Sequence, residues 1–183
     1  MILQSMISDL MLRFQKMGKY EKVSLVLLFP ANVMYTIAAS THFWFELPGV
    51  AWYGLFYAKF CDLLDECHYV PAFFTNEPGF YHLLQLVCVS AWACLALSFY
   101  MLISDSMDSR IPRILRKNRN NTIAFLCFAS AFAMSGGLYL FYYIINEFPR
   151  EVDKYPEMKW ASMFASLACG LEFLAGLLLL HAS

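Results

Sequence analysis

Four long apolar stretches divide this chain, and polar or charged segments separate them. Each stretch has about 20 residues, the length at which an α-helix crosses a hydrocarbon core of about 30 Å. The pattern therefore predicts an all-α membrane protein, a bundle of four transmembrane helices in one domain over residues 1–183. The predicted spans are residues 23–43, 81–103, 122–146 and 160–181.

The first 22 residues carry a different pattern, because apolar side chains recur there at intervals of three and four. Basic residues crowd the second half of this segment, at Arg13, Lys16, Lys19 and Lys22. One interpretation is an amphipathic helix on the membrane surface, with its cations near lipid phosphates. The other is a solvated leader that helps to orient the first span, and the sequence leaves both open.

Lysine and arginine are distributed unevenly among the segments between the spans. Nine of the 13 lie in residues 1–22 and 104–121, and four lie in residues 44–80 and 147–159. Cytoplasmic segments of membrane proteins carry an excess of these residues. We therefore expect both termini and the 104–121 loop in the cytoplasm, and the other two loops outside the cell.

The composition agrees with a membrane protein. Hydrophobic residues make up 60% of the chain and charged residues 15%, whereas soluble domains have roughly 45–50% and about 25%. The net charge of -1 and the lack of a long basic run give no indication of a nucleic-acid partner. The four histidines lack the spacing of metal ligands, and no nucleophile stands beside a base. We therefore predict a protein that is not an enzyme and has no cofactor or metal.

Two of the six cysteines differ from the rest in their position. Cys61 and Cys67 lie in the polar loop 44–80, which the charge distribution places outside the cell, where disulfides form and persist. The sequence therefore predicts a disulfide between them. The other four lie in apolar stretches, where a thiol is more often a small packing side chain. They are Cys88, Cys94, Cys127 and Cys169.

The 44–80 loop also carries strand signals, because aromatic-rich runs are bounded by Pro48-Gly49, the cysteines and Pro71. We predict two or three short strands, in a small extracellular antiparallel sheet formed mainly by this loop. Acidic residues lie between and beside the cysteines, either as a solvated loop tip or along a path for cations. They are Asp62, Asp65 and Glu66.

The fourth span holds a carboxylate near its middle, Glu172. A charged side chain at this depth costs roughly 2.5–3.5 kcal/mol on insertion scales, so we expect Glu172 to face the bundle and to form a hydrogen bond. Asn32 is the partner we predict, because its amide both donates and accepts. Three hydroxyls lie at similar depth, those of Thr36, Ser130 and Ser135. The role is structural or one in transport, and the sequence favours the structural one.

Small residues recur every four positions in the last two spans, a spacing typical of close helix packing. They are Ala129, Ala133 and Gly137 in the third span and Ser162, Ser166 and Gly170 in the fourth.

The loop after the first span resembles the first extracellular loop of the claudin superfamily, which includes the peripheral myelin and epithelial membrane proteins and the stargazin-type channel subunits. The resemblance rests on topology and on an ordered series of residues, in which Phe56 replaces the family's usual tryptophan. The series is Trp44, Gly54, Leu55, Phe56, Cys61 and Cys67.

This resemblance implies a location and a function. In the family the tryptophan and the Gly-Leu-aromatic step seat the extracellular sheet on the helices. The function it implies is cell–cell contact, a junction or a paracellular barrier at the plasma membrane, made through the extracellular loops. The alternative is an auxiliary subunit that modulates the gating or trafficking of an ion channel or receptor. The implied partners are the lipid bilayer and other membrane proteins, in the same membrane or across to another cell.

Overall fold

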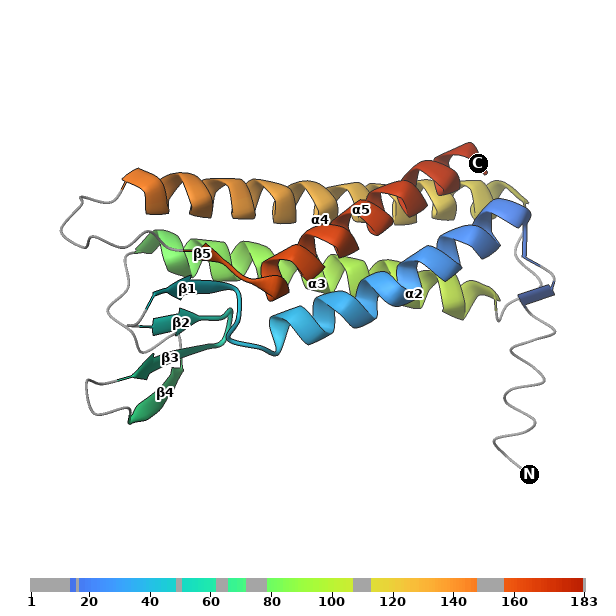
Figure 1. Ribbon diagram of the computed structural model, residues 1–183. Helices are drawn as coiled ribbons and strands as arrows, with labels where there is room; N and C mark the ends of the chain where they lie inside the picture. The colour runs from blue at the N-terminus through green and yellow to red at the C-terminus, as the bar shows by residue number, and fades with distance from the viewer. Residues whose placement is uncertain are drawn as a thin grey trace, which may run out of the picture.

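The computed structural model describes residues 14–15, 17–48, 51–61, 66–71, 79–106, 113–147 and 157–182. Four long helices run side by side, and a small sheet lies at one end of them (Figure 1). Helix α2 begins and helix α5 ends at the opposite end of the bundle (Figure 1). The helices are α2 (Lys19–Ala39), α3 (Gly79–Ser106), α4 (Arg113–Glu147) and α5 (Trp160–His181).

All four helices are long and apolar enough to cross a bilayer. Their outward surfaces carry large exposed apolar side chains, such as Val26, Leu86, Phe125 and Leu177. Apolar side chains on the outside of a bundle suit hydrocarbon and not water. The molecule therefore fits a multi-pass membrane protein, as the apolar pattern predicts.

The bounds of α5 are as predicted, whereas those of the other three helices differ from the prediction, most of all in α2 and at the start of α4. Helix α2 runs from Lys19 to Ala39 and not from residue 23 to residue 43, and beyond its end the hydroxyls of Ser40 and Thr41 donate to the carbonyls of Ile37 and Ala38. Helix α4 begins at Arg113, inside the predicted loop 104–121. Hydropathy marks the part of a helix that lies in hydrocarbon, and it does not detect a polar extension beyond the bilayer. The predicted surface helix at residues 1–22 lies largely outside the described residues.

The sheet has five antiparallel strands in the order β4-β3-β2-β1-β5. Four come from the 44–80 loop, so the prediction of two or three strands was too low. The strands of two and three residues are too short to give an alternating pattern in the sequence. The strands are β1 (Phe45–Leu47), β2 (Ala51–Tyr53), β3 (Tyr57–Cys61), β4 (Cys67–Pro71) and β5 (Glu157–Met158).

Strand β5 comes from the second predicted extracellular loop and pairs with β1, opposite Phe45 and Glu46. It leads directly into α5, while β1 follows α2. Helices α2 and α5 pack against each other, and both run obliquely relative to α3 and α4 (Figure 1). The β1–β5 pairing therefore continues the α2–α5 contact into the sheet and joins the sheet to two helices at once.

The helices form a ring in which α2 contacts α5, α5 contacts α4, and α4 contacts α3, with a less extensive contact between α3 and α2. Glycine allows close approach at two of these contacts. A Cβ on Gly137 would lie 3.2 Å from Leu84 of α3, and one on Gly176 would lie 3.1 Å from Phe128 of α4. Gly137 therefore packs as its four-residue spacing predicts.

The small-residue pattern in the fourth span was only partly right, because Ser162 is buried but the next two residues of the pattern are not. Gly170 and Ser166 are exposed, and a Cβ on Gly170 would meet nothing within 4 Å. The buried side of α5 is instead dominated by alanines. These are Ala161, Ala165, Ala168 and Ala175. Spacing alone does not say which of two small-residue sides of a helix faces its neighbours.

A buried polar cluster fastens α2 to α4 at the end away from the sheet. Glu21 accepts hydrogen bonds from Arg119 at 3.1 Å and from the side chain of Asn120 at 3.2 Å. Its second oxygen accepts from the backbone N–H of Gly18 at the start of α2. A buried carboxylate with a cation and two further donors meets the condition under which ionised groups are tolerated inside proteins.

Candidate functional site

Trp44 lies at the junction of the sheet and the bundle. Its side chain is fully buried, and its indole Nε1 donates to the carbonyl of Ala38 at the end of α2 at 2.6 Å. Its backbone N–H donates to Tyr53 of β2, and its carbonyl accepts from the N–H of Lys159. One residue therefore bonds to α2, to β2 and to the start of α5.

Gly54 brings the turn between β2 and β3 against the end of α2. A Cβ at this position would lie 2.6 Å from the Cα of His42 and still closer to the carbonyl oxygen of Thr41. Both are backbone atoms, which cannot rotate aside. Only glycine fits there, because it has no side chain.

The two residues after Gly54 extend this contact into the bundle. Leu55 is buried in the same apolar core as Trp44, and Phe56 packs against that core from its edge. The carbonyl of Leu55 accepts from the side chain of Gln85 in α3 at 2.6 Å. Trp44, Gly54, Leu55 and Phe56 therefore meet where the sheet joins the helices. The sequence analysis missed Gln85, although a glutamine inside an apolar span is a visible signal.

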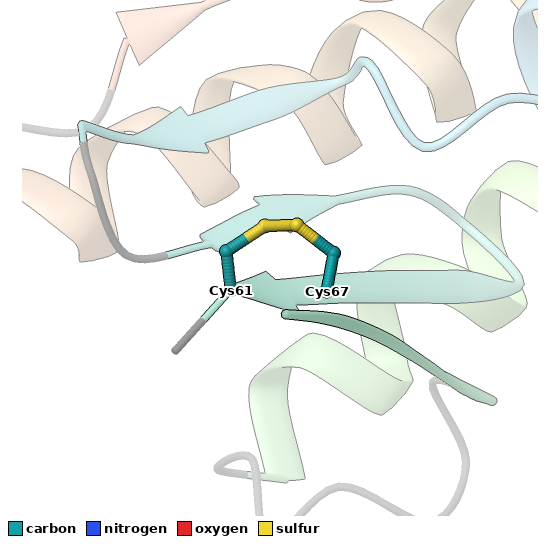
Figure 2. The surroundings of a disulfide bond; sticks show 2 residues. All are labelled: Cys61 and Cys67. Atoms are coloured by element: carbon teal, nitrogen blue, oxygen red, sulfur yellow. A yellow bond between two sulfur atoms is a disulfide. The ribbon is translucent and has the colours of Figure 1, made fainter. Parts of the chain in front are cut away.

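The predicted disulfide is present. Cys61 of β3 and Cys67 of β4 are directly opposite each other, and a bond joins their sulfur atoms (Figure 2). The bridge fixes the register of β3 and β4, at the edge of the sheet away from β5. Of the three acidic residues, Glu66 is exposed beside the bridge. Asp62 and Asp65 lie outside the described residues, so a path for cations stays a prediction.

One face of the sheet is buried and the other is open. Side chains directly opposite each other in antiparallel strands share a face. Phe45, Ala51 and Ala58 lie on one face and are buried. Trp52, Lys59 and Tyr69 lie side by side on the other face, in register across β2, β3 and β4. We call these three residues the outer row.

The outer row is held together by its cation. The Lys59 ammonium lies 5.1 Å from the centre of the Trp52 ring and 5.8 Å from that of Tyr69. Both distances are in the range of cation–π attraction. Tyr69 is 60% exposed, and Tyr57 on the same face is 54% exposed. The open face of the sheet therefore presents aromatic side chains around one lysine.

Two groups border the outer row. Lys159 forms ion pairs with Glu46 of β1 at 2.7 Å and with Glu157 of β5 at 2.8 Å. Hydrogen bonds to these two carboxylates raise the pKa of Lys159. His42 meets the Tyr69 ring edge-on at 5.5 Å. Partial burial and the nearby Lys59 lower the pKa of His42 from its usual 6.5.

Glu172 is fully buried inside the bundle, as its depth predicts, but its predicted partner was wrong. Its Oε2 lies 2.8 Å from the hydroxyl of Ser130 in α4. Asn32 instead donates to the carbonyl of Leu28 in its own helix. Depth along the axis matched all the candidates, but Asn32 is only half-buried, on the side of α2 where Phe29 and Thr36 contact α3.

The contacts around Ser130 also indicate the protonation state of Glu172. The Ser130 hydroxyl has one proton, yet its Oγ is 2.8 Å from both Glu172 and the backbone oxygen of Ala91 in α3. The Ala91 oxygen can only accept. A protonated Glu172 would donate its proton to the Ser130 oxygen and leave the hydroxyl proton for Ala91, so that each contact is a full hydrogen bond. The other oxygen of Glu172 has no hydrogen-bond partner among the described residues, which a neutral carboxyl tolerates better than a carboxylate does.

Other polar side chains of the interior bond to backbone oxygens of neighbouring helices. The Tyr35 hydroxyl donates to the carbonyl of Cys88 in α3 at 2.8 Å, and the Ser24 hydroxyl donates to that of Ala175 in α5 at 3.1 Å. Among the described residues, no three His, Cys, Asp or Glu side chains come together in a way that could hold a metal ion.

Comparison with known proteins gives no further assignment: no protein-family model matches the chain, and no curated protein matches it.

Proposed function

We propose that this protein is a claudin-like cell-surface protein that makes contacts between cells through the open face of its sheet. In this proposal the sheet lies outside the cell, and the end of the bundle where α2 begins and α5 ends lies in the cytoplasm. The uneven distribution of lysine and arginine supports that orientation. The disulfide supports it as well, because disulfides persist on the outer side of the membrane.

The observation that carries the proposal is the outer row with the exposed Tyr57 beside it. Tyrosine and tryptophan are enriched at protein–protein interfaces because each combines a large apolar surface with a polar group and few rotatable bonds. Here they lie on a sheet whose other face is fixed to the bundle through Trp44 and Leu55. A surface that is already rigid loses less conformational entropy when it binds a partner, and this favours its use as a contact surface.

A cell-aggregation assay tests the proposal. The full chain is expressed in suspension cells that do not adhere, and the size of the aggregates is measured. We expect wild-type expression to cause aggregation and the double variant Trp52→Ala, Tyr69→Ala to reduce it by more than half at equal surface levels. Tyr100→Ala is the matched control, because Tyr100 is 66% exposed but lies on α3. We expect it to leave aggregation unchanged.

Two results would contradict the proposal. One is an absence of aggregation when the wild-type chain is at the cell surface. The other is staining of terminal epitope tags on intact cells, which would place the sheet on the cytoplasmic side. If aggregation is absent and an ion channel co-purifies in fixed stoichiometry, the function becomes that of an auxiliary channel subunit.

A further inference from the structure

Asn32 is a polar side chain at hydrocarbon depth with unused hydrogen-bonding capacity. It lies seven residues before the last residue of α2, about 10 Å along the helix at 1.5 Å per residue. A carboxamide has two N–H donors and an oxygen that accepts. One donor bonds to the carbonyl of Leu28 at 2.9 Å. Among the described residues nothing bonds to the second donor or to the oxygen.

Asn32 lies on the outside of the bundle, where α2 meets α3. It is half-buried there, between two contacts of these helices. On one side Phe29 packs on Phe99, with ring centres 6.1 Å apart. On the other the indole N–H of Trp92 donates to the hydroxyl oxygen of Thr36 at 3.1 Å. We call these five residues the α2/α3 seam.

The seam faces lipid and not the interior of the bundle. Phe29 is 59% exposed, and Thr36 is exposed as well. Positions three and four apart on a helix share a side, so Asn32 lies in line with both. The exposed hydroxyl of Ser90 is satisfied within its own helix, by the carbonyl of Val87. Asn32 differs from Ser90 because its carbonyl oxygen cannot be satisfied by a backbone carbonyl.

We propose that the α2/α3 seam is the contact between two copies of this chain in the same membrane, with their Asn32 side chains bonded to each other. No water is present in hydrocarbon to satisfy a free amide, so a partner helix is the available source of hydrogen bonds. A carboxamide complements itself: the free N–H of one copy meets the free oxygen of the other. With a two-fold axis along the membrane normal, the same bond forms twice, and both copies have the same orientation in the membrane. The contact lies in one bilayer and does not depend on the proposed contact between cells.

Energy transfer between labelled copies in phosphatidylcholine vesicles tests this inference. The full chain is fused to donor or acceptor fluorophores, and pairing is followed as the ratio of protein to lipid is lowered. We expect the wild-type chain to pair and Asn32→Leu to raise the dissociation constant about eightfold, the effect of losing two interhelical bonds of average strength. Asn32→Gln should retain pairing, because it keeps both hydrogen-bonding functions.

Ser135→Leu is the matched control. Ser135 is also a polar, exposed residue of a spanning helix, but it lies on α4, which contacts α3 and α5. We expect it to leave the dissociation constant unchanged. Thermal unfolding and the Cys61–Cys67 bridge should be normal in Asn32→Leu, since leucine suits a surface that faces lipid.

Three outcomes would overturn the inference. The first is a wild-type chain that stays monomeric at every ratio of protein to lipid. The second is an Asn32→Leu variant that pairs as the wild type does. The third is a seam that binds a different membrane protein in cells while the purified chain does not pair with itself.

Discussion

Polar side chains have different roles at the sheet end and in the bundle interior, where they join helices through backbone oxygens and through side-chain pairs such as Glu21 and Arg119. On the open face of the sheet, Lys59 and Lys159 interact with other side chains, aromatic rings in one case and carboxylates in the other. In the interior, the hydroxyls of Tyr35 and Ser24 donate to backbone oxygens of neighbouring helices. The interior contacts hold helices together, whereas the sheet contacts form a surface that side-chain substitutions can change. We therefore place the proposed recognition surface on the sheet, while the bundle contacts hold the helices together.

Trp44 is where the two regions meet, and its removal should have the largest effect. Trp44→Ala deletes a fully buried side chain and its bond to Ala38. We expect a loss of about 3–5 kcal/mol in the free energy of unfolding. Thermal unfolding in detergent and delivery to the cell surface measure it. Trp160→Ala is the control, because Trp160 is 39% exposed and should cost much less. Equal losses in both variants would show that Trp44 is not the main joint.

Gly54 tests the same joint through the backbone. Gly54→Ala forces the β2–β3 turn away from the end of α2, and overpacking of this kind typically costs 1–3 kcal/mol, so we expect about that loss. Gly136→Ala is the matched control, since nothing lies within 4 Å of its Cβ position, and it should be neutral or stabilising. Thermal unfolding of the two variants gives the difference. A Gly54→Ala protein as stable as wild type would mean that the turn does not need this close approach.

The disulfide acts within the sheet and should leave the bundle unaffected. Replacing Cys61 and Cys67 with serine removes a bridge across a very short loop, which chain-entropy estimates put at about 2 kcal/mol. We expect aggregation to weaken while the helices unfold at nearly the wild-type temperature. Mass mapping of non-reduced peptides from the wild-type protein should show the two cysteines linked. Finding both thiols free would show that no disulfide stabilises this surface.

A smaller effect is expected in the interior, at Glu172. Glutamine can donate to Ser130 as a protonated carboxyl does, so Glu172→Gln should fold and traffic nearly normally. Interhelical hydrogen bonds in a membrane protein average about 0.6 kcal/mol, with a maximum of about 1.7 kcal/mol. A double-mutant cycle with Ser130→Ala should give a coupling in that range. If Glu172→Gln abolishes an associated conductance at normal surface levels, the role of Glu172 is in transport and not in packing.

The smallest expected effect is on the pH dependence of stability, and it involves His42 at the sheet end. Burial and Lys59 lower the pKa of His42 in the folded protein, so the folded state binds a proton less readily than the unfolded state. The contribution of His42 to stability is therefore fully present above its usual pKa of 6.5 and falls as the pH drops below that value. Thermal unfolding at a series of pH values should show a weaker acid dependence in His42→Gln. An identical pH profile would mean that His42 is as accessible to protons as in the unfolded chain.

The success of the sequence predictions depended on the range of the interaction. The disulfide was predictable because Cys61 and Cys67 are close in the chain and the polarity of their loop is local information. The partner of Glu172 was not predictable, because depth along each helix follows from the sequence but rotation about its axis does not. The same freedom explains the small-residue pattern in the fourth span, where Gly170 turned out to face outward and Ala168 inward.

The sequence by itself determined four apolar helices of spanning length, the loop that carries the sheet, and the cysteine pair. These follow from hydrophobicity and local spacing, which hold before any tertiary contact forms. Only the tertiary structure decided that β5 joins β1, that Gln85 bonds to Leu55, and that Glu172 meets Ser130 instead of Asn32. These contacts depend on how helices rotate and pack, and many weak contacts spread over the whole bundle set that arrangement. The same packing leaves Asn32 at a surface that faces lipid, from which its pairing with a second copy is inferred.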